Sequence, residues 1–287
     1  MYEYYDKISL LDTRVRMRWH MINKWLYEEM RELDTDKFQV IDLKEVDDIS
    51  QEVKEYIANH LISSFRNIEQ LKFRYKDRDK EELRKYIKEK IFPNQDNQFS
   101  KNVKQGDWGE VLSAIILNDI KSVILPITKL RWKINNEKSM FGTDVFAIRE
   151  NEEELPELIY CEVKTKITYD KEIGIKAYES LYRDNGSSLP DIIDFISKVY
   201  FEKGDYELAA KYDKIYLNMD NHTKEFQIFL IMDGSIWRDE IVDILKASSV
   251  DLERLFINIV LIPNFKDLIE ETYELTADIG EKLVYGE

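Results

Sequence analysis

Apolar residues in the first hundred positions recur mainly at three- and four-residue steps, which places them on one face of a helix. This spacing occurs over 19–30, where it includes Trp19, and again over 50–65. A charge-rich third helix is predicted over 79–92, where a proline stops it. The stretch 37–43 alternates instead, which predicts a short strand. We therefore expect residues 1–100 to form a mostly helical N-terminal region, with partner binding as its proposed role.

The pattern changes after the polar run 93–104, which mixes Asn, Gln, Asp and Ser without apolar spacing and predicts a domain boundary. Beyond it, helices alternate with short apolar strands. Strands are predicted over 130–134, 143–148, 158–165, 226–232 and 255–262, and helices over 108–120, 170–183, 189–201, 203–212, 236–247 and 264–274. This order predicts a second domain over 101–287, an α/β core with a mixed sheet flanked by helices.

Charge is spread unevenly along the chain. The whole chain has 42 Lys and Arg against 57 Asp and Glu, for a net charge of −15. Residues 1–138 contain 26 basic and 25 acidic side chains, whereas residues 139–287 contain 16 and 32. An acidic protein repels the phosphate backbone of DNA. We therefore expect the isolated chain to bind duplex DNA weakly and a partner to supply DNA capture.

Composition narrows the remaining classes. A single cysteine, Cys161, excludes an internal disulfide and favours a reducing compartment. The N-terminus lacks a signal-peptide pattern, and the longest apolar stretches fall far short of a membrane helix. We expect a cytoplasmic protein. The chain has no phosphate-binding glycine motif and no histidine pair at metal-ligand spacing, so neither a bound nucleotide nor a zinc site is expected.

Candidate chemistry gathers in three short segments, 106–110, 141–144 and 161–164. Side chains two positions apart on a strand point to the same face, so Glu162 and Lys164 project together. Asp144 stands at the start of the preceding strand, and a neighbouring strand can bring its carboxylate beside Glu162.

Two adjacent carboxylates need a cation, and Mg²⁺ prefers oxygen ligands while keeping several waters. We expect Asp144 and Glu162 to hold one or two Mg²⁺ or Mn²⁺ ions with the carbonyl of Val163, and Glu110 to be an additional ligand or a nearby group. Lys164 would position a metal-activated water and stabilise charge on a phosphate. The alternative is a plain ion pair between Glu162 and Lys164 on an edge strand.

Two basic residues near these segments are further candidates. Arg131 and Lys133 alternate on the strand predicted beside the site. They could contact phosphate or form a structural salt bridge, and the sequence leaves both readings open.

This arrangement resembles the PD-(D/E)xK nuclease superfamily, in which a helix bearing a Glu leads into strands that supply Asp and Glu-x-Lys. The matching positions are Glu110, Asp144, Glu162 and Lys164, although Thr143 replaces the proline that usually precedes the Asp. The resemblance implies a restriction-endonuclease-like core.

A narrower resemblance rests on the runs KLRWK at 129–133 and NNEKSMFGTDV at 135–145. They are similar to the C-terminal domain of the HamA family, the nuclease subunits of the Hachiman anti-phage defence system. The similarity spans 104–285. It implies infection-triggered DNA degradation, a HamB-like superfamily 2 helicase as partner, and catalytic roles for Asp144, Glu162 and Lys164.

Two other functions are compatible with the residues. The chain could be a non-catalytic adaptor that keeps a nuclease fold and binds a helicase. It could also be a stand-alone restriction-type endonuclease, which would need a target-recognition element that the sequence does not display.

Overall fold

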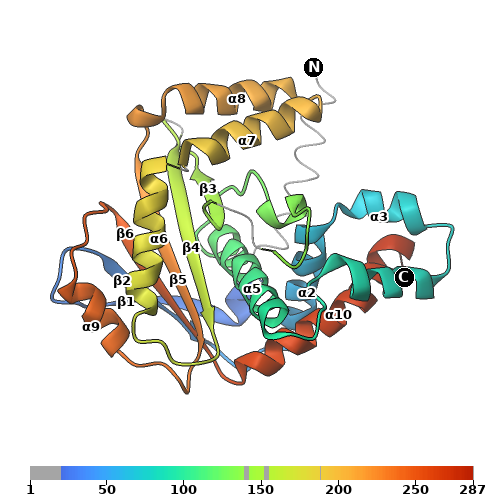
Figure 1. Cartoon of the computed structure of the whole chain (residues 1–287), viewed down its shortest axis with the longest axis horizontal. Helices are drawn as coiled ribbons and strands as arrows, with labels where there is room; N and C mark the ends of the chain where they lie inside the picture. Colours follow the sequence, from blue (N-terminus) through green and yellow to red (C-terminus); the bar gives the residue numbers. More distant parts are fainter. Residues whose placement is uncertain (1–20, 139–141, 152–154, 188, 287) are drawn as a thin grey trace.

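The computed structural model describes residues 21–138, 142–151, 155–187 and 189–286. Its centre is one six-stranded mixed sheet in the order β1-β2-β6-β5-β4-β3 (Figure 1). The strands are β1 (Leu26–Arg31), β2 (Gln39–Glu45), β3 (Val145–Arg149), β4 (Glu157–Lys166), β5 (Lys224–Asp233) and β6 (Leu255–Ile262). Strands β2, β6, β5 and β4 run parallel, and the edge strands β1 and β3 are antiparallel to their neighbours. The predicted α/β class with a mixed sheet is confirmed.

Helices cover both faces of the sheet. They are α2 (Gln51–Phe65), α3 (Ile68–Tyr75), α4 (Lys80–Tyr86), α5 (Gln98–Asp119), α6 (Ile173–Ser187), α7 (Leu189–Glu202), α8 (Tyr206–Leu217), α9 (Glu240–Ala247) and α10 (Phe265–Tyr285). Short helical turns are η1 (Ile22–Lys24), η2 (Ile87–Ile91), η3 (Lys129–Trp132) and η4 (Met219–Asn221). Residues of α2, α4, α5 and α10 share one buried cluster with the sheet, and residues of α6 to α9 share the other.

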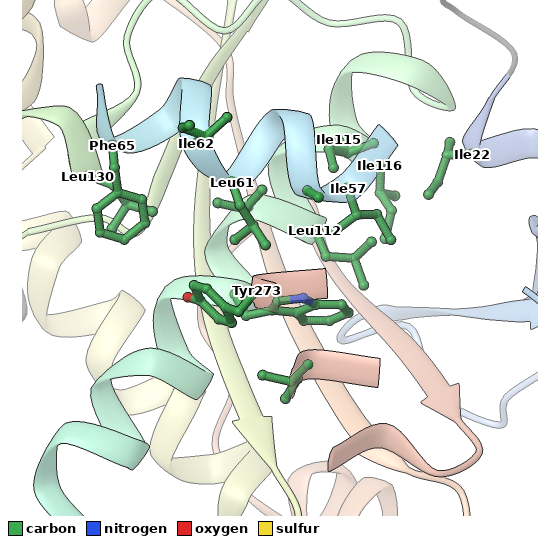
Figure 2. Close-up of a cluster of buried hydrophobic side chains, with 14 of the residues drawn as sticks. Ile22, Ile57, Leu61, Ile62, Phe65, Leu112, Ile115, Ile116, Leu130 and Tyr273 are labelled. Atoms are coloured by element: carbon green, nitrogen blue, oxygen red, sulfur yellow. The ribbon is translucent and has the colours of Figure 1, made fainter. Parts of the chain in front are cut away.

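The first cluster joins the N-terminal region to the sheet. In Figure 2, Ile57 and Leu61 of α2 lie on the side of the helix toward Leu112 of α5, with Ile116 beside Ile57. Helix α10 crosses beneath and completes the packing (Figure 1). The buried apolar surface therefore holds α2, α5 and the sheet in one continuous core.

The alternation of β4 decides which side chains face which helices. Ile159, Cys161 and Val163 lie on the α5 side of the sheet, whereas Leu158 and Tyr160 lie on the α6 side. Glu162 and Lys164 continue the α6 side, because successive strand residues alternate between faces. Figure 1 shows β4 between α5 and α6.

Two predicted elements are wrong. The stretch predicted as a helix over 19–30 contains η1 and the edge strand β1, which pairs with β2; Trp19 lies outside the described residues. Only Leu26 of β1 is fully buried, so no strand alternation marks it in the sequence. The strand predicted over 130–134 is the turn η3. There Leu130 and Lys133 are both buried at the three-residue spacing of a 3₁₀-helix.

The region around residue 100 also differs from the expectation. Helix α5 begins at Gln98 rather than 108, because the Asn97 side chain caps it by accepting from the Ser100 amide at 2.9 Å. The first hundred residues supply two strands to the sheet in addition to their helices. The division into domains at residue 100 stays a prediction.

Candidate active site

Asp144 lies directly before β3, at the end of the sheet where β3 pairs with β4. Its amide donates to the carbonyl of Cys161 at 3.1 Å, and its Oδ2 accepts from the Val163 amide at 2.9 Å. Because Val145 pairs with Cys161 in the antiparallel register, Asp144 stands opposite Glu162. The structure therefore brings the two carboxylates to one place, as the order of the strands suggested.

Glu162 is buried, with 4% of its surface exposed, although it is an acidic residue. Burial raises its pKa to about 7, and the negative charge of Asp144 acts in the same direction. Lys164 opposes that shift by donating to Glu162 Oε1. The Lys164 side chain is 28% exposed, so its ammonium lies on the solvent side of the buried carboxylate.

Lys129 of η3 is a central residue of the site that the sequence analysis did not single out. Its buried ammonium lies 3.1 Å from the Thr143 carbonyl, 3.3 Å from Asp144 Oδ1 and 4.0 Å from Glu110 Oε2. Burial acts to lower the pKa of Lys129, but Glu110 and Asp144 outweigh it, so the pKa lies above its ordinary value. Lys129 therefore forms a permanent internal cation between two carboxylates.

Glu110 reaches the site because α5 packs very closely on β4. A Cβ at Gly109 would lie 1.9 Å from Thr165 Oγ1, so only glycine allows this approach. Burial raises the pKa of Glu110 to about 8, and its Oε2 atom has no hydrogen-bond partner. An orphaned buried carboxylate oxygen is costly, and a proton or a cation would satisfy it.

One turn before Glu110, a second buried pair anchors η3 to α5. Lys133 Nζ donates to both carboxylate oxygens of Asp107, at 2.5 and 2.6 Å, and both side chains are almost fully buried. Of the two interpretations of Lys133, the structural salt bridge is the one observed. Arg131 points elsewhere and donates to the Ser63 carbonyl of α2.

A small cavity opens beside these groups. It measures about 30 Å³, and its polar lining includes Glu110, Lys129 and Asp144. Val111, Leu125 and other apolar side chains form its remaining wall. This volume accommodates about two water molecules or an ion with its water.

The donor set fits a magnesium-type ion. Across the described residues, no three or more His, Cys, Asp or Glu side chains gather in a metal-binding cluster. Mg²⁺ is often held by only one or two carboxylates and several waters. Asp144 and Glu162, with the carbonyl of Val163, offer oxygen ligands of that kind. Glu110 Oε2 lies 4.0 Å from Lys129 Nζ, and its role as an additional ligand stays a prediction.

These features define an α/β protein with cross-strand carboxylates and a lysine at one end of a mixed sheet. Residues 20–275 match the HamA family, and the chain belongs to that family. Membership implies a component of the Hachiman defence system. The match includes β1 and β2, so it extends well beyond the 104–285 similarity noted from the sequence. No match was found among curated proteins.

No helix in the described ranges is long and apolar enough to cross a membrane. The run at 135–145, which carries part of the resemblance to the HamA family, includes residues 139–141, and these lie outside the described residues.

Proposed function

We propose that this protein is a metal-dependent deoxyribonuclease of the PD-(D/E)xK type and the effector subunit of an anti-phage defence complex. One observation supports this most strongly: Asp144 stands opposite Glu162, and Lys164 follows on the same face of β4. That geometry brings two oxygen donors and a solvent-accessible ammonium to one end of the sheet.

In this proposal Asp144, Glu162 and the Val163 carbonyl hold Mg²⁺ or Mn²⁺. The bound ion would lower the pKa of a water and stabilise charge on a phosphate oxygen. Lys164 lies where it can orient that water and offer positive charge to the phosphate. The Val163 amide donates to Asp144 Oδ2 at 2.9 Å and so restricts rotation of that carboxylate.

Lys129 and Glu110 support this pair. Lys129 bonds Asp144 Oδ1, the oxygen that the Val163 amide leaves free, so both oxygens of Asp144 are held. Its charge also reduces the repulsion among Asp144, Glu110 and Glu162. We assign Glu110 to the positioning of Lys129 and, through it, of Asp144.

A partner follows from the charge and from the family. An acidic chain captures DNA poorly by itself, so a HamB-like superfamily 2 helicase would deliver the strand. A stand-alone restriction-type enzyme is the weaker alternative, because the sequence displays no target-recognition element. Burying Glu162 beside Asp144 costs free energy. An adaptor that only binds the helicase does not require this arrangement.

The test is cleavage of labelled DNA by the chain, alone and with its helicase partner and ATP, in Mg²⁺. Glu162→Gln and Lys164→Met should each lower the rate by roughly 10²–10³-fold, as loss of a charge-stabilising group does. Glu179→Gln changes an exposed carboxylate on α6 and should cleave like the wild type. Wild-type rates in the two site variants would refute the proposal.

A metal titration separates the enzyme from the adaptor. The wild-type chain should bind Mn²⁺ in calorimetry, and Asp144→Asn should lose that heat. A chain that binds no divalent ion and cuts no DNA with its partner would be an adaptor. Near-unchanged melting temperatures in the variants would show that the fold is intact.

A further inference from the structure

A second, larger hollow lies on the other side of η3. This groove of about 660 Å³ runs between α3, η3 and the end of α7. Its lining includes Arg66, Arg74, Arg131 and Lys203, together with the aromatic side chains of Tyr86 and Trp132. Glu69 is the one acidic residue that lines it, and Lys72 pairs with that carboxylate at 2.9 Å.

These four cationic side chains contact carbonyl oxygens, a hydroxyl or aromatic rings. Arg66 donates to the Phe65 carbonyl at 2.7 Å and to the Tyr86 hydroxyl at 3.3 Å. Arg74 lies over the Tyr86 ring at 5.4 Å, and Lys203 lies over the Tyr200 ring at 5.2 Å. Within the described ranges, none of the four forms an ion pair with a carboxylate. A protein of net charge −15 therefore has a local concentration of positive charge here.

Arg131 adds an independent sign that the groove takes an anion. Its guanidinium is partly buried and donates to the Ser63 carbonyl, and its buried Nε atom has no hydrogen-bond partner among the described residues. Burying a guanidinium without a carboxylate is costly, and an anionic ligand would offset that cost. Phosphate oxygens match the guanidinium fork well.

Trp132 supplies a different kind of contact. Its side chain is 38% exposed, and its ring meets Phe195 edge-on at 5.6 Å, which holds the indole in place. A fixed, exposed indole is a stacking platform for an unpaired base, worth about 1–3 kcal/mol per base. Duplex DNA keeps its bases stacked inside and cannot use this contact.

We propose that the groove binds single-stranded DNA, with Arg66, Arg74, Arg131 and Lys203 on its phosphates and Trp132 against a base. The same turn, η3, supplies Lys129 to the candidate active site and Arg131 and Trp132 to the groove. A strand in the groove would therefore contact the same turn that holds Asp144 through Lys129. That the bound strand is then cleaved rests on the proposed function. Its binding in the groove does not.

The groove is consistent with an acidic protein that depends on a partner for DNA. Five cationic side chains line it, but Lys133 is paired with Asp107, so four are left for phosphates, fewer than a high-affinity duplex binder uses. Neutralising four phosphates of a single strand gives a salt slope near −3, at about −0.7 for each phosphate. Binding should be measurable at low salt and weak at physiological salt, which suits a strand that a helicase has already unwound.

The experiment uses the full chain carrying Glu162→Gln, in EDTA, so that binding is measured without cleavage. Fluorescence anisotropy follows a labelled 12-nucleotide single strand at low salt. Arg74→Glu with Lys203→Glu should weaken binding by at least 10-fold and make the salt slope shallower by about 1.4. Trp132→Ala should weaken binding by roughly 5–100-fold, the range expected for one lost stack.

The matched control reverses two exposed charges outside the groove, Arg78→Glu with Lys266→Glu, which pair with Glu82 and Glu270. It should bind within two-fold of the parent. Equal weakening in the control, tighter binding of a duplex of the same length, or stronger binding of an acidic peptide would each overturn the proposal. If the single strand binds in the groove but the wild-type chain cuts no DNA in Mg²⁺ with its helicase partner and ATP, the groove proposal stands and the nuclease proposal is refuted.

Discussion

The three lysines that bond carboxylates in and near the candidate active site and the four other cations of the groove meet at η3, but their environments differ. Lys129, Lys133 and Lys164 each bond a carboxylate, namely Asp144, Asp107 and Glu162. The four groove cations bond carbonyls, hydroxyls or aromatic rings and have no carboxylate partner in the described part of the chain.

This difference separates two uses of positive charge. A buried lysine beside a buried carboxylate stabilises the position of both groups, because removing either leaves an uncompensated charge. A cation on an open groove without a carboxylate contributes little to the fold and keeps its charge for a ligand. The net charge of the whole chain does not reveal which cations are paired with carboxylates, because it sums over both regions.

The largest expected effect is on stability, at the Asp107–Lys133 pair. Lys133→Met should lower the free energy of unfolding by about 3–5 kcal/mol, because Asp107 would stay buried without a partner. Urea denaturation measures this loss. Asp107→Leu combined with Lys133→Met should recover most of it, since an apolar pair replaces the ionic one. A loss below 1 kcal/mol in the single variant would show that the pair is not part of the anchor.

A smaller effect is expected from pH at the carboxylates of the site. Burial raises the pKa of Glu162 to about 7 and that of Glu110 to about 8. Each carboxyl is therefore easier to keep in the fold when neutral, so this contribution to stability is present at low pH and is lost as pH rises through 7 to 8. The metal-free protein should melt at a higher temperature at pH 6 than at pH 8.5, other groups being equal.

Two measurements check the cause of that pH dependence. Differential scanning calorimetry should show Mg²⁺ raising the melting temperature more at pH 8.5 than at pH 6, because a cation favours the charged carboxylates. Glu162→Gln should flatten the profile of the metal-free protein, while Glu179→Gln, on an exposed position, should leave it unchanged. A profile unaffected by Glu162→Gln would contradict the assignment.

The smallest expected effect is at the groove. Arg74→Glu with Lys203→Glu should change the free energy of unfolding by no more than about 0.5 kcal/mol per substitution, because neither exposed residue has a carboxylate partner to lose. Chemical denaturation tests this directly. If the free energy of unfolding fell as much as in Lys133→Met, the groove cations would stabilise the fold. The two regions would then not differ in how they use positive charge.

Elements with a strong local pattern could be predicted from the sequence. The continuous apolar runs of β4, β5 and β6 and the helix spacing of α2 were sufficient. Burial of both strand faces leaves an unbroken apolar run, and burial of one helix face leaves a period near 3.6 residues. Strand β1 could not be found this way, because it is an edge strand with one fully buried residue and depends on β2 for its pairing.

The candidate site divides along similar lines. The spacing of Glu162 and Lys164 places them on one strand face, and the order of the strands suggests Asp144 as their neighbour. Lys129 carried no comparable signal, because a lysine in a short turn is usually solvated. For Lys133 the sequence left a phosphate contact and a structural salt bridge both open. Their burial became evident only when η3 was packed between α2 and α5.

The sequence by itself determined the α/β class, the strand that holds Glu162 and Lys164, and the uneven distribution of charge. Those features depend on local periodicity and composition, which the chain displays without folding. Only the tertiary structure decided which lysines are paired, how closely Gly109 lets α5 approach β4, and where unpaired cations gather. Each of these depends on contacts between residues far apart in the sequence, and burial changes the energy of a charge only after those contacts form.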